Sequence, residues 1–252
     1  MAEALPMASD TPPRVREFHL NMAIACLVLA FTGFLPTYWV PLARQAFQAD
    51  PIVHIHALFF FGWTVFLVGQ AYLTVRGRLQ RHRAFGVAGV ALATAMVFTG
   101  VLMTIHSLKH DVPIDPGTAK AFSIVSFSGI VFFAIAVTIA LANVRNPELH
   151  RRLMLLATIS IVQAPVGRWF LAAFRPADAI GAPPVVVTIP AAFVVDLLIV
   201  AAVIYDTRTR GRPHRVWVIG GLSLLALQLL RLPLSTSTTW TAVADTLLAL
   251  AP

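Results

Sequence analysis

The sequence predicts an all-α integral membrane protein: a helical bundle of seven transmembrane helices followed by a short interfacial helix at the C-terminus. Three observations predict this fold class. Apolar residues make up 58% of the chain, charged residues only 12%, and the mean hydropathy is +0.79. A soluble domain carries about twice that share of charged residues. The charges lie in short clusters between long apolar runs, a pattern typical of membrane spans joined by polar loops, so a soluble globular protein is excluded.

The first expected element is a span over residues 20–41. It follows a polar tail, residues 1–18, in which Arg14 and Arg16 stand just before the apolar run. The run is longer than the core of about 7–15 residues found in secretory signal peptides. No site of the small-x-small kind ends it. We therefore expect a first span that is retained in the protein.

Six further apolar runs follow, each long enough to cross about 30 Å of hydrocarbon at about 1.5 Å per residue. They cover residues 53–75, 84–106, 122–144, 153–174, 184–205 and 216–234. A polar break at residues 235–239 precedes residues 240–250, which are too few to span. We expect this last segment to lie at the interface with Trp240 as an anchor, although it could also re-enter the membrane. The whole chain is then a single membrane domain.

The basic residues predict the orientation of the chain. Thirteen Lys and Arg residues lie on one side of the expected membrane. This side carries the N-terminus and the loops between spans 2 and 3, spans 4 and 5, and spans 6 and 7. The other side has Arg44, Lys109, Lys120 and Arg175. This asymmetry places the N-terminus in the cytoplasm and the C-terminus in the periplasm. The net charge of +8 is explained by topology and by contacts with anionic membrane lipids, so we expect no nucleic-acid partner.

Histidines mark the expected outer ends of two neighbouring spans. His54 and His56 open the second span, and His106 closes the third, which runs the opposite way. His56 shares one helix face with Trp63 and Gln70, whereas His54 lies about 200° around the helix from His56. Imidazoles from facing helices can hold haem b or a transition metal. The candidate cofactor ligands are His106 and one of His54 or His56, and the candidate metal ligands are His56 and His106. The alternative is that these are interfacial histidines that bind water or headgroups.

A second histidine group is expected at the cytoplasmic side. His82 and His150, with His214, each follow or precede arginines in a loop. Together with the outer group they could form two stacked sites, one in each leaflet. The alternative is that the basic loops contact anionic lipid and that the histidines are ordinary loop residues.

Polar residues within the expected hydrocarbon form a third group. Gln163 and Arg168 lie in the fifth span, Asp196 in the sixth, and Gln228 and Arg231 in the seventh. A charged side chain at mid-membrane costs roughly 2.5–3.5 kcal/mol or more. One explanation is a structural salt bridge from Asp196 to Arg168 or Arg231. The other is a net positive pocket, since two arginines against one aspartate suit a carboxylate, a haem propionate or a lipid phosphate.

These motifs resemble those of two known groups. The motifs that carry the first resemblance are His-x-His-Ala-x-x-Phe-x-x-Trp at residues 54–63, Gln70, His82-Arg83-x-x-Gly86, Glu148-Leu-His150-Arg-Arg-Leu-Met154 and Arg168. Over roughly residues 50–215 the chain resembles, in these motifs, a family of bacterial inner-membrane proteins of unknown function. That resemblance implies a multi-pass protein of the bacterial inner (cytoplasmic) membrane. Histidines at both ends of adjacent spans are also similar to two-haem cytochromes of the b561 type, whose ligands lie inside the spans, whereas His82 and His150 are expected at loop edges.

Together the sequence favours a site in the outer leaflet that binds haem, a metal or an anionic lipophilic molecule such as a quinone, in a respiratory or assembly context. Its residues would be His54 or His56, His106, Arg168, Asp196 and Arg231. One alternative is a small transporter or lipid-handling protein that uses Asp196 as a protonatable switch. Another is a cofactor-free accessory subunit that packs against other subunits of a larger membrane complex. The sequence has no nucleophile triad, phosphate-binding glycine loop or paired carboxylates, and whether the chain is an enzyme stays open.

Overall fold

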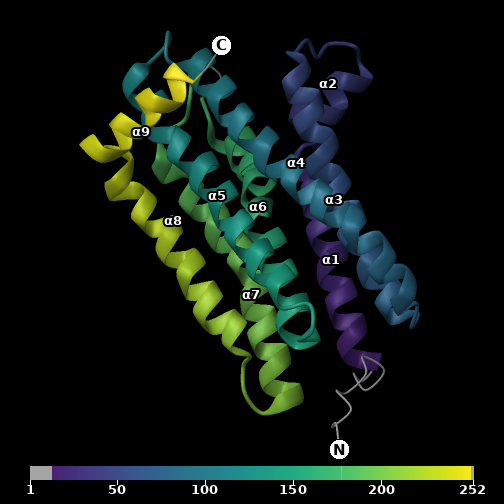
Figure 1. The fold of residues 1–252 in the computed structure, drawn as a ribbon. Helices are drawn as coiled ribbons and strands as arrows, with labels where there is room; N and C mark the ends of the chain where they lie inside the picture. The colour runs from purple at the N-terminus through teal and green to yellow at the C-terminus, as the bar shows by residue number, and fades with distance from the viewer. Residues whose placement is uncertain (1–12, 177, 251–252) are drawn as a thin grey trace, which may run out of the picture.

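The computed structural model describes residues 13–176 and 178–250, and within these ranges every regular element is a helix (Figure 1). The prediction of an all-α fold is therefore confirmed. The longer helices are α1 Pro13–Gly33, α3 Pro51–Val75, α4 Leu79–Asp111, α5 Pro116–Ala142, α6 Pro147–Phe174, α7 Thr188–Arg210 and α8 Gly221–Ser235. Of the predicted polar tail, residues 1–12 lie outside the described residues, and residues 13–18 already belong to α1.

Six helical segments are long and apolar enough to cross a membrane. They are α3, α4, α5, α6, α7 with the short η3 Val185–Val187 before it, and α8 with the π-helical turn η4 Val216–Gly220 before it. The predicted span at residues 20–41 is broken: α1 ends at Gly33, and η2 Leu35–Trp39 and α2 Val40–Ala43 continue at a bend of 42°. Pro36 accounts for this break, because it has no N–H to continue the helical ladder of α1. The predicted count of seven spans is reached only if this bent pair counts as one.

Two helices begin earlier than the predicted spans, and at α6 a capping side chain sets the start. The α6 helix begins at Pro147, where the Asn146 side chain accepts a hydrogen bond from the Leu149 N–H at 3.2 Å. The predicted span began at residue 153. The α4 helix also begins early, at Leu79 rather than residue 84, although the Arg78 side chain before it makes no capping hydrogen bond. His82 and His150, expected at loop edges, therefore lie in the first turns of helices.

The α6 helix is the centre of the bundle. It packs against α1, α5 and α7, and 61% of its apolar window is buried, against 17% for α3. The α1 helix approaches it closely at Gly33, where a Cβ atom would lie 2.4 Å from the Pro165 carbonyl oxygen. Large apolar side chains on the outer helices point outward, for example Val87 at 74% and Phe98 at 68% exposed. This arrangement suits a hydrocarbon environment.

The two ends of the bundle differ in charge. The start of α1 and the loops at residues 76–78, 143–146 and 211–215 lie at one end, which we name the arginine-rich end (Figure 1). The opposite end carries α2, the turn at residues 112–115 and the C-terminal helix α9 Thr238–Ala249. The α9 helix is attached to α5 by the Lys120–Asp245 ion pair at 2.7 Å and by a hydrogen bond from Trp240 Nε1 to the Lys120 carbonyl at 2.7 Å. Its predicted interfacial depth stays a prediction.

Candidate functional site

A cavity of about 430 Å³ lies inside the half of the bundle near the opposite end. Its walls come from α1, η2, α3, α4, α5, α6, α7 and α8 together with the segment that joins α6 to α7. Most of the lining is apolar, and hydroxyls of serine and threonine interrupt it. Its strongly polar side chains are His56, Asp111, Gln163, Arg168, Arg175 and Arg231. The volume falls within the range of about 300–1,000 Å³ of small-molecule sites.

Arg231 is fixed at the cavity wall by neutral partners from two other helices. Its Nε donates to Ser128 Oγ at 2.8 Å, and its Nη1 donates to Gln163 Oε1 at 2.7 Å. Gln163 in turn donates from Nε2 to the Thr188 carbonyl at 3.1 Å. Only 2% of Arg231 is exposed. The guanidinium is thus oriented by α5 and α6, but these hydrogen bonds bring it no negative charge.

Arg168 lines the same cavity, with its guanidinium carbon 5.3 Å from the centre of the Phe34 ring. In the described part of the chain neither Arg168 nor Arg231 forms an ion pair. Arg175, which also lines the cavity, donates from Nη2 to the Gly181 carbonyl at 2.5 Å. Among the described residues that line the cavity, these three arginines face one carboxylate, that of Asp111. The cavity is therefore a net positive site with apolar walls.

His56 brings an unpaired nitrogen to the cavity. Its Nδ1 is buried and has no hydrogen-bond partner among the described residues, while the ring interacts with the Thr99 backbone and packs 4.1 Å from the centre of the Phe60 ring. The other members of its predicted face, Trp63 and Gln70, are 0% and 9% exposed, so this face does point into the bundle. A buried nitrogen without a partner is a natural contact for a ligand.

The other two outer histidines do not join His56 in the cavity lining. His54 Nδ1 lies 3.1 Å from the Tyr38 hydroxyl, and His106 Nδ1 lies 3.5 Å from an Asp50 carboxylate oxygen. The α4 helix presents residues 100, 103, 104, 107, 108 and 111 to the cavity, and His106 lies off this stripe. The expected shared site of His56 and His106 is therefore not assembled around the cavity. Within residues 13–176 and 178–250, no group of three or more His, Cys, Asp or Glu side chains could hold a metal ion.

Asp196 has a partner other than the one expected. Gln228 Nε2 donates to Asp196 Oδ1 at 3.2 Å, and Asp196 forms no ion pair with any described residue. Asp196 thus forms neither of the expected salt bridges, although it lies close enough to Arg231 for the two charges to attract each other. The reason is helix phase: Gln228 and Arg231 lie three residues apart on α8, where Gln228 contacts α7 and Arg231 contacts α5 and α6. Asp196 does not line the cavity.

Two of the inner histidines do meet, at the arginine-rich end. The rings of His82 and His150 lie 6.4 Å apart, centre to centre, and are nearly perpendicular at 80°. His150 Nδ1 lies 2.9 Å from the Ala140 carbonyl oxygen. His82 Nδ1 and Gln70 Oε1 are buried without a hydrogen-bond partner among the described residues. His214 has a separate contact, accepting a hydrogen bond at Nδ1 from the Val216 N–H at 3.2 Å.

Sequence reasoning missed a buried ion pair between α6 and α7. Arg152 donates from Nε and Nη2 to the two carboxylate oxygens of Asp206 at 2.9 and 2.6 Å, and both residues are at most 1% exposed. The Glu148 carboxylate forms an ion pair with Arg152 and another with Arg210. The predicted fifth span begins directly after Arg152, and the predicted sixth span ends directly before Asp206. The signal that could have identified the pair is an aspartate that directly continues an apolar run.

The two ends therefore offer different chemistry. At the arginine-rich end, carboxylates neutralise the buried arginine, which is a structural arrangement. In the cavity, the arginines keep unpaired positive charge beside apolar walls and an unpaired imidazole nitrogen, which suits a ligand. No protein-family model, curated protein or solved structure matches this chain.

Proposed function

We propose that this protein binds a membrane-soluble molecule with an anionic or carbonyl-bearing head, such as a quinone, in the cavity lined by His56, Arg168 and Arg231. The observation that supports the proposal is the presence of two arginines without an ion pair, in the described part of the chain, in one largely apolar cavity. Guanidinium groups in such surroundings are costly unless acceptor oxygens satisfy them. Carbonyl or carboxylate oxygens of a ligand would do so through charge-assisted hydrogen bonds.

The proposal includes a location in a bacterial inner membrane with the N-terminus in the cytoplasm. Its support is the asymmetry of basic residues between the two ends and the resemblance to bacterial inner-membrane proteins. In this orientation the cavity lies in the outer leaflet, where a lipophilic ligand could reach it from the membrane. A respiratory or assembly context, with other membrane subunits as partners, would follow from a quinone ligand.

Haem b is the competing occupant of the same cavity. Its propionates could contact Arg168 and Arg231, and His56 could offer an axial nitrogen. The second imidazole of a bis-histidine haem is not among the described residues that line the cavity. This difference favours the quinone-like ligand. A visible absorption spectrum of the purified protein separates the two, because only haem gives a Soret band.

The test is a titration of the purified protein in detergent with a short-chain quinone, followed by quenching of tryptophan fluorescence. We expect saturable binding that Arg231→Gln weakens about 10-fold or more, since a hydrogen bond to a charged group contributes about 1.5–3 kcal/mol. Arg168→Gln should weaken binding independently, because the Arg168 guanidinium lies over Phe34 rather than within the Ser128–Gln163 network. The control is Arg212→Gln, an exposed residue of the arginine-rich end. Absence of saturable binding, or equal affinity in all four proteins, would overturn the proposal.

A further inference from the structure

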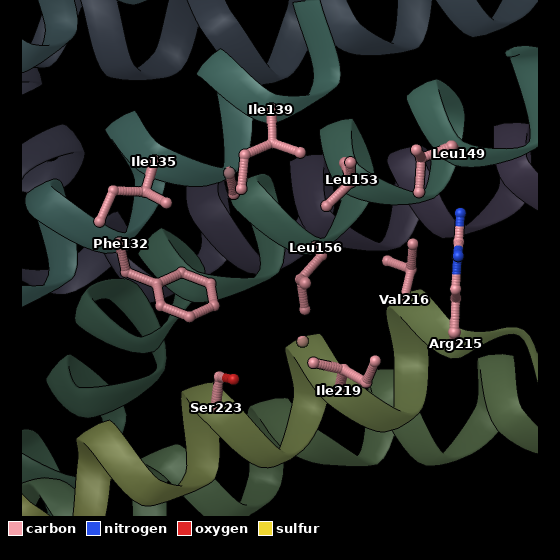
Figure 2. Close-up of a pocket in the computed structure, with 12 residues that line it drawn as sticks. Phe132, Ile135, Ile139, Leu149, Leu153, Leu156, Arg215, Val216, Ile219 and Ser223 are labelled. Carbon is pink, nitrogen blue, oxygen red and sulfur yellow. The ribbon is translucent and has the colours of Figure 1, made fainter. Parts of the chain in front are cut away.

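A second hollow lies on the outside of the bundle, in a groove of about 270 Å³ between α5, α6 and the η4–α8 segment (Figure 2). Its lining is apolar or glycine except for Arg215 and Ser223. Ile135, Ile139 and Ile219 line it and remain 54%, 44% and 64% exposed. Apolar side chains this exposed on a spanning segment face hydrocarbon. The groove therefore opens toward the lipid.

The groove has one polar end. Figure 2 shows Arg215 beside Leu149 at one end, with Phe132 and Ser223 toward the other. Arg215 belongs to the loop at residues 211–215, so this is the arginine-rich end of the molecule. Its side chain is exposed and forms no ion pair with any residue in the described ranges. The unpaired Arg215 guanidinium thus lies at the end of the groove that is expected at the membrane surface.

The length of the groove matches one leaflet. From Arg215 to Ser223 the chain advances by eight residues, some of them in the π-helical turn η4, so the length is at most about 12 Å at 1.5 Å per residue. One leaflet contributes about 15 Å, half of the hydrocarbon thickness of about 30 Å. Gly220 lets η4 pack closely on α6 at the floor of the groove, because a Cβ there would lie 2.3 Å from Leu156 Cδ2. An extended acyl chain from a single leaflet fits these dimensions.

We propose that this groove binds one anionic phospholipid, with an acyl chain along α5 and α8 and the phosphate at Arg215. The guanidinium is the preferred side chain for phosphate, to which it donates two parallel hydrogen bonds. Arg215 is the arginine that lines the groove, and its charge favours a headgroup with a net negative charge over a zwitterionic one. The proposal is independent of the cavity, because none of the cavity arginines lines the groove.

Native mass spectrometry of the full-length protein tests this site. The probe is an equimolar mixture of phosphatidylglycerol and phosphatidylcholine with identical acyl chains. We expect the protein to retain one phosphatidylglycerol about fivefold over phosphatidylcholine, the ratio expected for one arginine near an anionic headgroup. Arg215→Gln should abolish this preference and Arg215→Lys should keep part of it. The matched control is Arg212→Gln, which changes an exposed arginine outside the groove and should keep the full preference.

Filling the groove tests the acyl chain separately. Ser223→Trp and Ile139→Trp each place an indole in the groove and should reduce retention of both lipids, whereas Arg231→Gln, in the cavity, should change neither. The proposal is overturned if wild-type protein shows no preference, or if Arg212→Gln removes the preference as fully as Arg215→Gln. It is also overturned if the protein is a lipid-free dimer that the indole variants convert to monomer, because a second copy would then occupy the groove.

Discussion

Arg152 and Arg231 are both buried arginines, at 0% and 2% exposed, but their neighbours give them different roles. Two carboxylates surround Arg152, so its charge is neutralised within the protein. Arg231 has the hydroxyl of Ser128 and an amide oxygen as partners. A neutralised guanidinium stabilises the contact between helices, whereas an oriented and positive one is prepared for an anionic or carbonyl-bearing ligand.

We predict that Asp206→Asn destabilises the protein by about 3 kcal/mol, because it removes the carboxylate that faces both Nε and Nη2 of a buried arginine. Thermal or denaturant unfolding in detergent measures this loss. The double variant Arg152→Met/Asp206→Leu should lose less, since it leaves no buried charge. A double variant at least as unstable as the single one would show that the pair contributes more than its mutual neutralisation.

His214 predicts a dependence of stability on pH. Burial, together with the charges of Arg152 and Arg210, lowers the pKa of His214 from 6.5 to about 4 in the folded protein. Because the folded pKa lies below the unfolded one, the contribution of His214 is fully present above about pH 6.5 and is lost as the pH falls toward about 4. Wild-type Tm should therefore decrease more between pH 7 and about pH 4.5 than the Tm of His214→Asn. Parallel curves for the two proteins would contradict the pKa shift.

At the scale of elements, α6 organises the bundle, and its contact with α1 depends on a glycine. Gly33 ends α1 directly against Pro165, just before the bend into η2. The α6 helix also carries Gln163 and Arg168 to the cavity and Arg152 to the ion pair at the other end. A change in the packing of α6 should therefore affect both ends of the molecule.

We predict that Gly33→Ala destabilises the protein by about 1–3 kcal/mol, because the added Cβ would lie 2.4 Å from the Pro165 carbonyl oxygen and force the two helices apart. The matched control is Gly69→Ala in α3, where no atom lies within 4 Å of the added Cβ. That substitution should leave stability unchanged or raise it slightly, because alanine favours the helix. Comparing the two melting temperatures in the same detergent measures the difference, and equal values would show that α1 moves away without cost.

At the scale of the whole molecule, the buried ion pairs and the enclosed cavity lie toward opposite ends. Ion pairs between α6 and α7 lie at the arginine-rich end, and residues toward the end that carries α9 line the cavity. The described chain begins at the first end and finishes, in α9, at the other. This polarity fits a protein whose basic end contacts anionic lipid and whose ligand enters at the other leaflet.

We predict that the arginine-rich end faces the cytoplasm. A reporter that is active only in the cytoplasm should give signal when fused after Arg78 and should be silent when fused after α9. A reporter active only in the periplasm should give the reverse result. Cytoplasmic activity of the fusion after α9 would invert the orientation and would move the proposed ligand site to the inner leaflet.

The sequence by itself determined the helical class, the positions of six spans and the separation of basic residues between the two ends. It could do so because hydrocarbon acts on each segment separately, and every spanning segment must satisfy its own backbone and hide its own charges. Hydrophobicity could not fix the break after Gly33 or the early start of α6, which depend on Pro36 and on the Asn146 cap.

The tertiary structure alone decided which polar side chains meet. The depth of Asp196, His56 and His106 along their helix axes can be predicted by counting residues. The rotation of those helices about their axes cannot be predicted in this way. Rotation places His106 off the cavity-facing stripe of α4 and turns Asp196 toward Gln228. It also joins Arg152 to Asp206 across 54 residues of chain. Height follows from counting residues, whereas rotation depends on how all neighbouring surfaces pack, and that is a property of the assembled bundle.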